Sequence, residues 1–238
     1  MQEWSERTLL LFGDEKLIRL EDAKILVIGV GGVGAYAAEM LVRAGIGSIA
    51  IVDGDTVSMS NINRQLPALH STIGESKTRV LSERFLDINP DLDICVIDLF
   101  ITPDNLNELF TGKRYDYVID AIDTVAPKVA LIEHCLRNRI KIISSMGAGG
   151  RIDPVKVQYA DIAYTYHDGL AKAVRTRLRE QGISGGLKVV WSPEQPCKSS
   201  LMMTSGTQNK RSSYGTVSYM PCVFGCMLAA YVIRKITG

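Results

Sequence analysis

The 238-residue sequence has no CxxC pair, no internal repeat and almost no net charge. Its five cysteines are scattered and odd in number, so neither a disulfide framework nor a four-cysteine zinc site is predicted, and no structural zinc is expected. A reducing, cytoplasmic compartment fits this cysteine usage. Lysines and arginines number 27 against 26 aspartates and glutamates, a formal charge of +1, which excludes a protein coated in basic charge but allows a local basic patch.

A targeting segment and a long apolar run are lacking as well. The first residues carry charges on both sides of a short apolar run, unlike a secretory signal. The longest apolar stretch, from Tyr219 to Ile233, contains Pro221 and is shorter than the roughly 20 residues needed to cross a bilayer. We interpret it as a buried core helix, and the alternative is a helix that lies on a membrane surface or on another subunit.

Short β-branched runs alternate with segments of helical periodicity from Lys24 to about Ser145. We expect strands at 24–30, 48–53, 93–101, 115–122 and 140–145, and helices at 34–45, 74–90, 102–110 and 126–139. Strands separated by helices of this length form a parallel sheet with right-handed crossovers. The fold is therefore predicted to be α/β, with a doubly wound, mostly parallel, Rossmann-like sheet.

The pattern is looser after Gly147. Residues 147–163 suggest one or two strands in another direction, followed by a polar crossover segment with one helix at 169–182 and by a C-terminal helix at about 222–236. The polar segment lacks apolar residues for a core of its own. We therefore predict one domain, 1–238, with an N-terminal helical arm (1–23), a core (24–162), an insertion or substrate segment (163–215) and the C-terminal helix (216–238).

A glycine-rich loop, from Gly29 to Gly34, follows the first strand directly and begins a helix. Glycines at such positions allow a tight turn and a close approach of phosphate, and the helix N-terminus holds the negative charge. Asp53 ends the next strand about 20 residues later, where a carboxylate binds ribose hydroxyls. The sequence thus predicts a nucleotide site in the core, formed by Gly29, Gly31, Gly32, Gly34 and Asp53.

Cationic residues beside this loop favour a nucleoside triphosphate over a nicotinamide cofactor. Arg64, Gln65 and Lys77 follow the second strand. Hydride transfer does not need them, whereas the charges of a triphosphate are offset by arginine and lysine donors. Of the two acids Asp120 and Asp123 near the end of a later strand, Asp123 is suited to position Mg²⁺ near the phosphates. We therefore expect ATP and Mg²⁺ as cofactors.

Four segments, GVGGVG, VDGDTVSMSNINRQ, GESK and DAIDT, resemble the ATP-binding core of the ubiquitin-activating-enzyme-like superfamily, the ThiF/MoeB/HesA adenylating proteins. The resemblance covers about residues 7–152. It implies a homodimer in which Arg7 reaches the ATP of the other subunit. The catalytic residues implied are Arg7, Arg64, Lys77 and Asp123, the last also as the metal ligand. The nucleotide-binding residues implied are Gly29, Gly31, Gly32, Gly34, Asp53, Asp55, Ser60, Asn61, Arg64, Gln65 and Lys77.

Segments outside this core resemble the tRNA threonylcarbamoyladenosine dehydratase branch of the superfamily, among them INPDLDICVIDLFITPDNL, GAGGRIDPVKVQYADIAYTYHDGLAKAVRTRLR and SPEQP. This resemblance implies that ATP activates the carboxylate of a threonylcarbamoyl group next to the tRNA anticodon, and that the carbamoyl group then closes a ring with loss of AMP. The absence of zinc-binding CxxC pairs agrees with a reaction without sulfur transfer. The alternatives are an adenylyltransferase for a sulfur-carrier or ubiquitin-like protein, and a nucleotide-binding adaptor without enzymatic activity.

A local basic patch is the expected contact with tRNA. It consists of Lys172, Arg175, Arg177 and Arg179 in one predicted helix, with Lys210 and Arg211 farther along the chain. Such a patch binds phosphates even when the net charge is small, although a solvated helix face explains the same residues. Tyr164, Tyr166 and Trp191 are candidates for stacking on anticodon-loop bases, and burial explains them equally well.

Several further ligands and partners are left open by the resemblance. They are a monovalent cation, a partner from a cysteine-desulfurase system, and a peripheral contact of the C-terminal helix with the inner face of the membrane. Cys197 is the only cysteine of the polar segment, and we interpret it as incidental rather than as a nucleophile.

Overall fold

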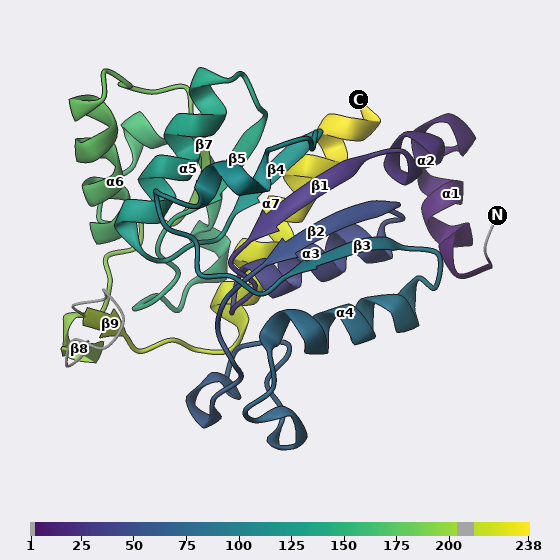
Figure 1. Cartoon of the computed structure of the whole chain (residues 1–238). Helices are drawn as coiled ribbons and strands as arrows, with labels where there is room; N and C mark the ends of the chain where they lie inside the picture. The colour runs from purple at the N-terminus through teal and green to yellow at the C-terminus, as the bar shows by residue number, and fades with distance from the viewer. Residues whose placement is uncertain (1–2, 204–211) are drawn as a thin grey trace.

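A seven-stranded sheet with the strand order β3-β2-β1-β4-β5-β7-β6 forms the centre of the computed structural model, which describes residues 3–203 and 212–238 (Figure 1). The strands are β1 (Lys24–Ile28), β2 (Ser48–Val52), β3 (Asp93–Ile97), β4 (Tyr117–Asp120), β5 (Ile142–Ser145), β6 (Gln158–Asp161) and β7 (Lys188–Trp191). All neighbouring strands are parallel except β6 and β7, which are antiparallel. A second, two-stranded sheet pairs β8 (Leu201–Met203) with β9 (Ser212–Tyr214).

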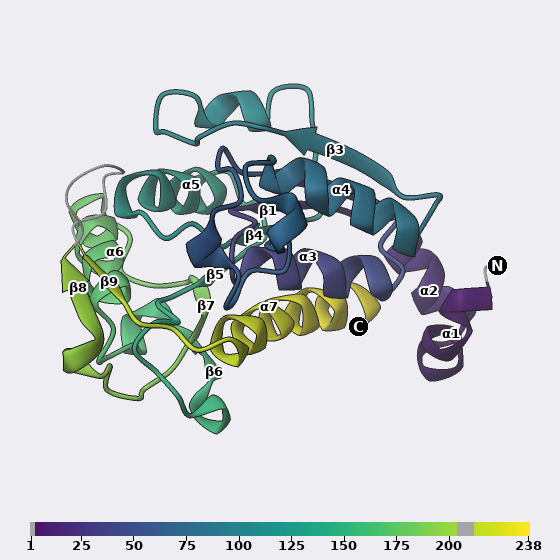
Figure 2. The ribbon, with the colours of Figure 1, turned by 90° about the horizontal axis from the view of Figure 1, so that it is seen from below.

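Helices cover both faces of the large sheet, which confirms the predicted doubly wound α/β fold (Figure 2). The α-helices are α1 (Glu6–Phe12), α2 (Asp14–Glu21), α3 (Gly34–Arg43), α4 (Lys77–Ile88), α5 (Val125–Arg137), α6 (Gly169–Glu180) and α7 (Tyr219–Thr237). Short 3₁₀-helices lie at Glu3–Ser5, Met59–Asn61, His70–Thr72, Leu106–Leu109, Pro154–Lys156, Ile162–Tyr164 and Lys198–Ser200. One core layer contains residues of α2, α3, α4 and α7, and the other contains residues of α5 and α6.

The C-terminal helix α7 lies alongside α3 (Figure 2). By length and composition alone it could cross a membrane. Phe224, Leu228 and Val232 are nevertheless fully buried in the core that α7 shares with α3. A Cβ atom at Gly225 would overlap the carbonyl oxygen of Val33, so the two helices approach closely at this glycine. The helix is thus packed as the predicted core helix.

Two segments differ from the sequence-based expectations. Residues 102–110 form no α-helix, because the side chain of Asn105 accepts from the Thr102 N–H and donates to the Phe100 carbonyl, and only the 3₁₀ turn Leu106–Leu109 follows. The polar segment 163–215 contributes β7 to the large sheet, between β5 and β6, which the sequence did not predict. Three of the four residues of β7, Val189, Val190 and Trp191, are buried, so this segment shares the main core.

Candidate functional site

The predicted nucleotide residues lie in loops at the carboxyl ends of β1, β2 and β4. The glycine loop follows β1, Asp53 and the segment 55–65 follow β2, and Asp123 follows β4. Lys77 is the first residue of α4. Because neighbouring parallel strands end at the same edge of a sheet, the fold brings these distant parts of the sequence together there, beside the point where the strand order reverses.

The four loop glycines do two different things. Gly29 has a φ of 84°, and a Cβ atom on it would lie 2.8 Å from the carbonyl oxygen of Ala121, while one on Gly34 would overlap the carbonyl of Gly29. These two glycines are required for the turn itself. A Cβ on Gly31 would instead meet the Gln65 side chain at 3.6 Å, and one on Gly32 would lie 3.2 Å from Pro221. Gly32 therefore allows the loop to pack closely against Pro221, whereas a Cβ on Gly31 would make only an ordinary contact with Gln65.

Asp53 fastens this loop to the next one. One carboxylate oxygen accepts from the Val30 N–H at 2.8 Å, and the other accepts from the Asp55 N–H at 2.9 Å. Burial raises the pKa of Asp53, and the nearby charge of Lys77 opposes this rise. An ionised carboxylate has about four acceptor sites, so the oxygens retain capacity for ribose hydroxyls, and that role stays a prediction.

Lys77 is held in place by burial and by an ion pair. Its side chain is 5% exposed, and its Nζ lies 2.7 Å from Asp55 Oδ2. The Lys77 N–H also donates to the Asp55 carbonyl at 3.2 Å. The Ser76 side chain caps α4 by accepting from Arg79 N–H. The ammonium is therefore a fixed positive charge at a helix N-terminus rather than a solvated one.

Arg64 lies over the glycine loop and is anchored within its own segment. Its Nη1 donates to the Ser60 carbonyl and to Asn63 Oδ1, both at 2.8 Å. Burial lowers its pKa, and the charge of Asp123 opposes this shift. Asn61 is buried, and its Oδ1 accepts from the Ser58 N–H, so in this structure it shapes the segment.

One buried polar atom at this site points to a ligand. Gln65 Oε1 has no hydrogen-bond partner within the part of the chain that the structure describes. Unpaired buried acceptors are costly, and the Gln65 amide lies 3.6 to 3.8 Å from the place that a Cβ on Gly31 would take. An acceptor without a partner beside the glycine loop is consistent with a donor group of a bound ligand. Within residues 3–203 and 212–238 no group of three or more metal-binding side chains occurs.

The two aspartates near the end of β4 differ in environment. Asp123 is exposed, and its negative charge opposes the lowering of the Arg64 pKa that burial causes. Asp120 is fully buried, and its Oδ2 lies 2.8 Å from the Nζ of Lys128, which is also fully buried. Ser144 Oγ donates to the same oxygen at 2.6 Å. The sequence predictions did not include Lys128 or Ser144, and only Asp123 of the two acids is placed to meet a ligand.

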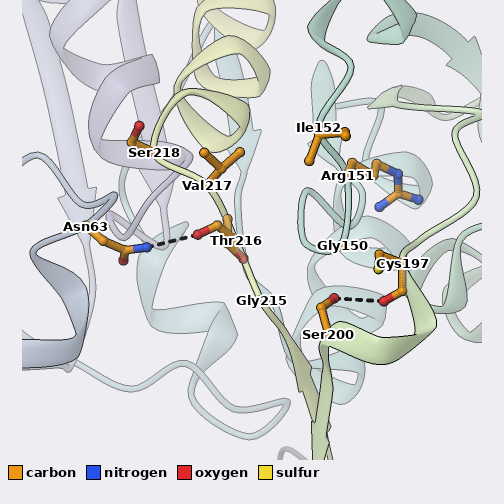
Figure 3. Close-up of a pocket in the computed structure, with 10 residues that line it drawn as sticks. All are labelled: Asn63, Gly150, Arg151, Ile152, Cys197, Ser200, Gly215, Thr216, Val217 and Ser218. Atoms are coloured by element: carbon orange, nitrogen blue, oxygen red, sulfur yellow. Dashed lines mark hydrogen bonds between the residues drawn. The ribbon is translucent and has the colours of Figure 1, made fainter.

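A cavity of about 550 Å³ adjoins the nucleotide residues at Asn63 (Figure 3). Asn63 Nδ2 donates to the Thr216 carbonyl at 2.9 Å on one side, and Ser200 Oγ donates to the Cys197 carbonyl at 2.8 Å on the other. The Cys197 thiol is exposed, and a hydrogen bond with Ser199 lowers its pKa. The lining is completed by Gly150, Arg151, Ile152, Gly215, Val217 and Ser218. This volume is in the range of small-molecule sites.

The predicted tRNA-binding residues are distributed unevenly. Lys172, Arg177 and Arg179 are exposed on α6. Arg175 donates to the carbonyl and the hydroxyl of Thr165, at 3.0 and 2.6 Å, so it is engaged locally. Lys210 and Arg211 lie outside the described residues.

The predicted stacking residues differ in exposure. Tyr164 is 78% exposed and Tyr166 is 54% exposed, whereas Trp191 is 3% exposed and packs edge-on against Tyr166. Burial therefore explains Trp191, and the two tyrosines are open to a ligand.

Arg7 is far from the glycine loop of its own chain. It is an exposed residue of α1, and α1 lies at the opposite end of α3 from the loop (Figures 1 and 2). The same arm exposes apolar side chains: Leu10 is 79% exposed and Leu11 is 77% exposed. Contiguous exposed apolar residues are typical of an interaction surface.

Comparisons with known proteins show which family this chain belongs to and which proteins it is similar to. The model of the ThiF family matches residues 5–238. The chain is 45% identical to the tRNA threonylcarbamoyladenosine dehydratase of Bacillus subtilis, over 80% of this chain and 74% of that protein. It is 41% identical to the dehydratase of the same description from Haemophilus influenzae, over 95% of this chain and 90% of the relative. The crystal structure of the Escherichia coli dehydratase TcdA in complex with ATP matches with a TM-score of 0.88 and 38% identity, over 98% of this chain and 93% of that one.

Proposed function

We propose that this chain, which belongs to the ThiF family, is an ATP-dependent tRNA threonylcarbamoyladenosine dehydratase. The observation that carries the proposal is the match, at 38% identity, to an ATP-bound dehydratase over 98% of the chain. The proposed substrate is tRNA that carries a threonylcarbamoyl group, and the protein would be a tRNA-modifying enzyme of the cytoplasm.

The reaction has two steps that balance without an external oxidant or reductant. A carboxylate oxygen of the threonylcarbamoyl group attacks the α-phosphorus of ATP, and pyrophosphate leaves. The carbamoyl group then attacks the activated carbonyl carbon, gives up an N–H proton to solvent and closes a ring, and AMP leaves with the oxygen that the carboxylate has lost. The protein's task is to position the reactants and to offset the charge that develops on the phosphates.

The charged residues at the strand ends provide these functions. Lys77, fixed by Asp55, and Arg64, anchored to Ser60, lie beside the glycine loop and offset the negative charge of the phosphates. Asp123 would hold Mg²⁺, which supplies charge stabilisation when it is bound. Gln65 Oε1 would accept a hydrogen bond from the nucleotide.

A homodimer completes each site in this proposal. Arg7 would reach the phosphates bound by the other subunit, since α1, the helix that carries it, lies at the opposite end of α3 from the glycine loop (Figures 1 and 2). The exposed residues Leu10 and Leu11 beside it would be covered by the second copy. A two-fold dimer uses the same surface on both subunits, so one such contact produces two equal sites.

The second half of the chain would bind the tRNA. The cavity beside Asn63 has room for the threonylcarbamoyl group next to the phosphates. Lys172, Arg177 and Arg179 on α6 would contact phosphates of the anticodon stem, and Tyr164 and Tyr166 would stack on its loop bases. The proposed reaction requires no thiol, no cysteine-desulfurase partner, no monovalent cation and no membrane contact.

The test is a conversion assay with purified protein, ATP, Mg²⁺ and tRNA that carries the threonylcarbamoyl group. Mass spectrometry of the nucleosides should show the loss of one water per modified nucleoside, with one AMP and one pyrophosphate formed. The matched control is the same tRNA without the threonylcarbamoyl group, which should produce neither. AMP release that depends on a sulfur-carrier protein and not on the modified tRNA would overturn the proposal, as would ATP binding without turnover.

A further inference from the structure

We infer that Lys128 is a positioning residue for this reaction: its buried ammonium fixes the peptide group that precedes Asp123 and thereby sets the place of the Asp123 carboxylate. The inference rests on the proposed role of Asp123 as the magnesium ligand. Lys128 itself is fully buried in α5, so its effect on the reaction would be exerted through the backbone.

The chain segment in question has no regular backbone structure of its own. Strand β4 ends at Asp120 and α5 begins at Val125. Both backbone groups of Ile122 are bound by side chains instead: its N–H donates to Asp120 Oδ1 at 3.0 Å, and its carbonyl accepts from Lys128 Nζ at 2.9 Å. These two bonds fix the residue directly before Asp123, so the position of Asp123 depends on Asp120 and Lys128.

Asp120 and Lys128, the two side chains that fix Ile122, are themselves held in place. Lys128 Nζ and Asp120 Oδ2 are 2.8 Å apart with both side chains fully buried, and Ser144 Oγ donates to the same oxygen at 2.6 Å. The ammonium therefore contacts a carboxylate and a carbonyl, and the carboxylate contacts an ammonium, a hydroxyl and a backbone amide. A network with its polar atoms satisfied in this way is rigid.

Stability alone does not explain the buried ion pair of Lys128 and Asp120. Removal of two charges from water costs several kcal/mol per ion, and well-packed apolar residues often replace a buried pair with no loss of stability. An apolar pair at these positions would leave the N–H and the carbonyl of Ile122 without partners. Fixed backbone next to the proposed metal ligand is the gain that offsets the cost of burial.

The experiment compares Lys128→Met, which removes the ammonium at similar volume, with Lys128→Arg, which keeps the charge. The matched control is Arg84→Met, which breaks another ion pair of a buried acid, with Glu39 at 2.6 Å, between α3 and α4. Three quantities are measured: the Mg²⁺ concentration at half-saturation of ATP binding by calorimetry, hydrogen exchange of residues 121–124, and kcat and KM with modified tRNA.

For Lys128→Met we expect the half-saturating Mg²⁺ concentration to rise and kcat to fall, each about 10- to 100-fold, as for other residues that orient a metal ligand. Exchange in residues 121–124 should accelerate, while the KM for tRNA stays within about twofold, since the tRNA contacts are elsewhere. Lys128→Arg should recover most of the loss. Arg84→Met should lower the melting temperature without changing Mg²⁺ dependence or the exchange of this segment.

Unchanged Mg²⁺ dependence and unchanged exchange in Lys128→Met would overturn the inference. If that variant does not fold, the double variant Asp120→Asn, Lys128→Met leaves no unpaired charge in the core and takes its place in the same measurements. A wild-type protein that binds Mg·ATP but does not convert the tRNA would refute the proposed function instead, and the binding and exchange measurements would still decide the role of Lys128.

Discussion

The candidate site has two parts that are built differently. We call them the nucleotide half, with the glycine loop, Asp53, Lys77 and Asp123, and the substrate half, with the cavity beside Asn63 and the residues Tyr164 and Tyr166. In the nucleotide half, the charged side chains already have partners within the protein: Asp53 accepts from two backbone amides, Lys77 pairs with Asp55, and Lys128 pairs with Asp120. In the substrate half, Tyr164 and Tyr166 are exposed and the cavity beside Asn63 is open. A small ligand of constant shape suits a preorganised site, whereas a large tRNA requires a surface.

The largest effect is expected for Lys77→Ala, which tests the nucleotide half directly. Loss of its fixed charge should lower pyrophosphate release with modified tRNA by about 10²- to 10³-fold, the usual cost of one donor that stabilises transition-state charge. Stability should also fall, because Lys77 is buried and its removal leaves Asp55 without its partner. Turnover and tRNA affinity are measured together on folded protein.

The affinity of Lys77→Ala for tRNA should equal that of the wild type, since the proposed tRNA surface lies in the other half. Near-normal pyrophosphate release would contradict the role of Lys77. A parallel loss of tRNA binding would break the comparison between the two halves.

The next effect concerns Arg7, which in the proposed homodimer would link the nucleotide half of one subunit to the arm of the other. Arg7→Ala should lose most of its activity, because its charge would be missing from the partner's site. A mixture of Arg7→Ala with Lys77→Ala should recover about a quarter of the wild-type activity per site, since half of the dimers are mixed and one of their two sites is intact. Pyrophosphate release after subunit exchange measures this recovery, and its absence would place Arg7 outside the active site.

The parts of the site that could be predicted are those in which spacing alone fixes the chemistry. The glycine loop, Asp53 and Lys77 were expected at one sheet edge, because each follows or begins a regular element and parallel strands end together. Strand β7 was not predicted, because its run of buried residues is only three long and stands within a polar segment. A short strand of this kind is stabilised by its neighbours β5 and β6 rather than by its own pattern.

Lys128 was missed for a related reason. A lysine in a helix is usually solvated, and the sequence analysis assigned Lys128 no role. The signal was nevertheless present, since Lys128 has the helical spacing of the buried residues Leu131, Ile132 and Cys135 on the same face of α5. A charged residue in phase with an apolar face predicts a buried partner, and the partner here, Asp120, is the last residue of β4.

A smaller effect is expected for Tyr164→Ala, which tests the substrate half alone. Loss of one stacking ring should weaken binding of a modified anticodon stem-loop about tenfold, within the usual contribution of a base on an aromatic side chain. Tyr164→Phe keeps the ring and should bind as the wild type does. Fluorescence anisotropy measures both affinities, and calorimetry should show unchanged ATP binding. Equal affinities of the Ala and Phe variants would remove Tyr164 from the tRNA surface.

The smallest effect on activity is expected for Glu39→Gln, which tests how the nucleotide half is held together away from its ligand. Burial opposes ionisation of Glu39, but hydrogen bonds from Arg84 and Arg43 outweigh it and lower its pKa below the ordinary value of 4.5. Because the folded-state pKa is the lower one, the stabilisation is present above about pH 4.5 and is lost as the pH falls through the folded-state value. At pH 7 the variant should be less stable by about 1–2 kcal/mol, below the range for a fully buried pair, since both arginines are half-exposed.

Urea unfolding of wild type and Glu39→Gln at a series of pH values checks this prediction. The difference between their free energies of unfolding should shrink as the pH drops below 4.5, while ATP binding at pH 7 stays unchanged. A difference that is constant with pH would mean that the α3–α4 contact depends on packing rather than on charge. The nucleotide half would then be held by its core alone, and its ionic contacts would matter only where they meet the ligand.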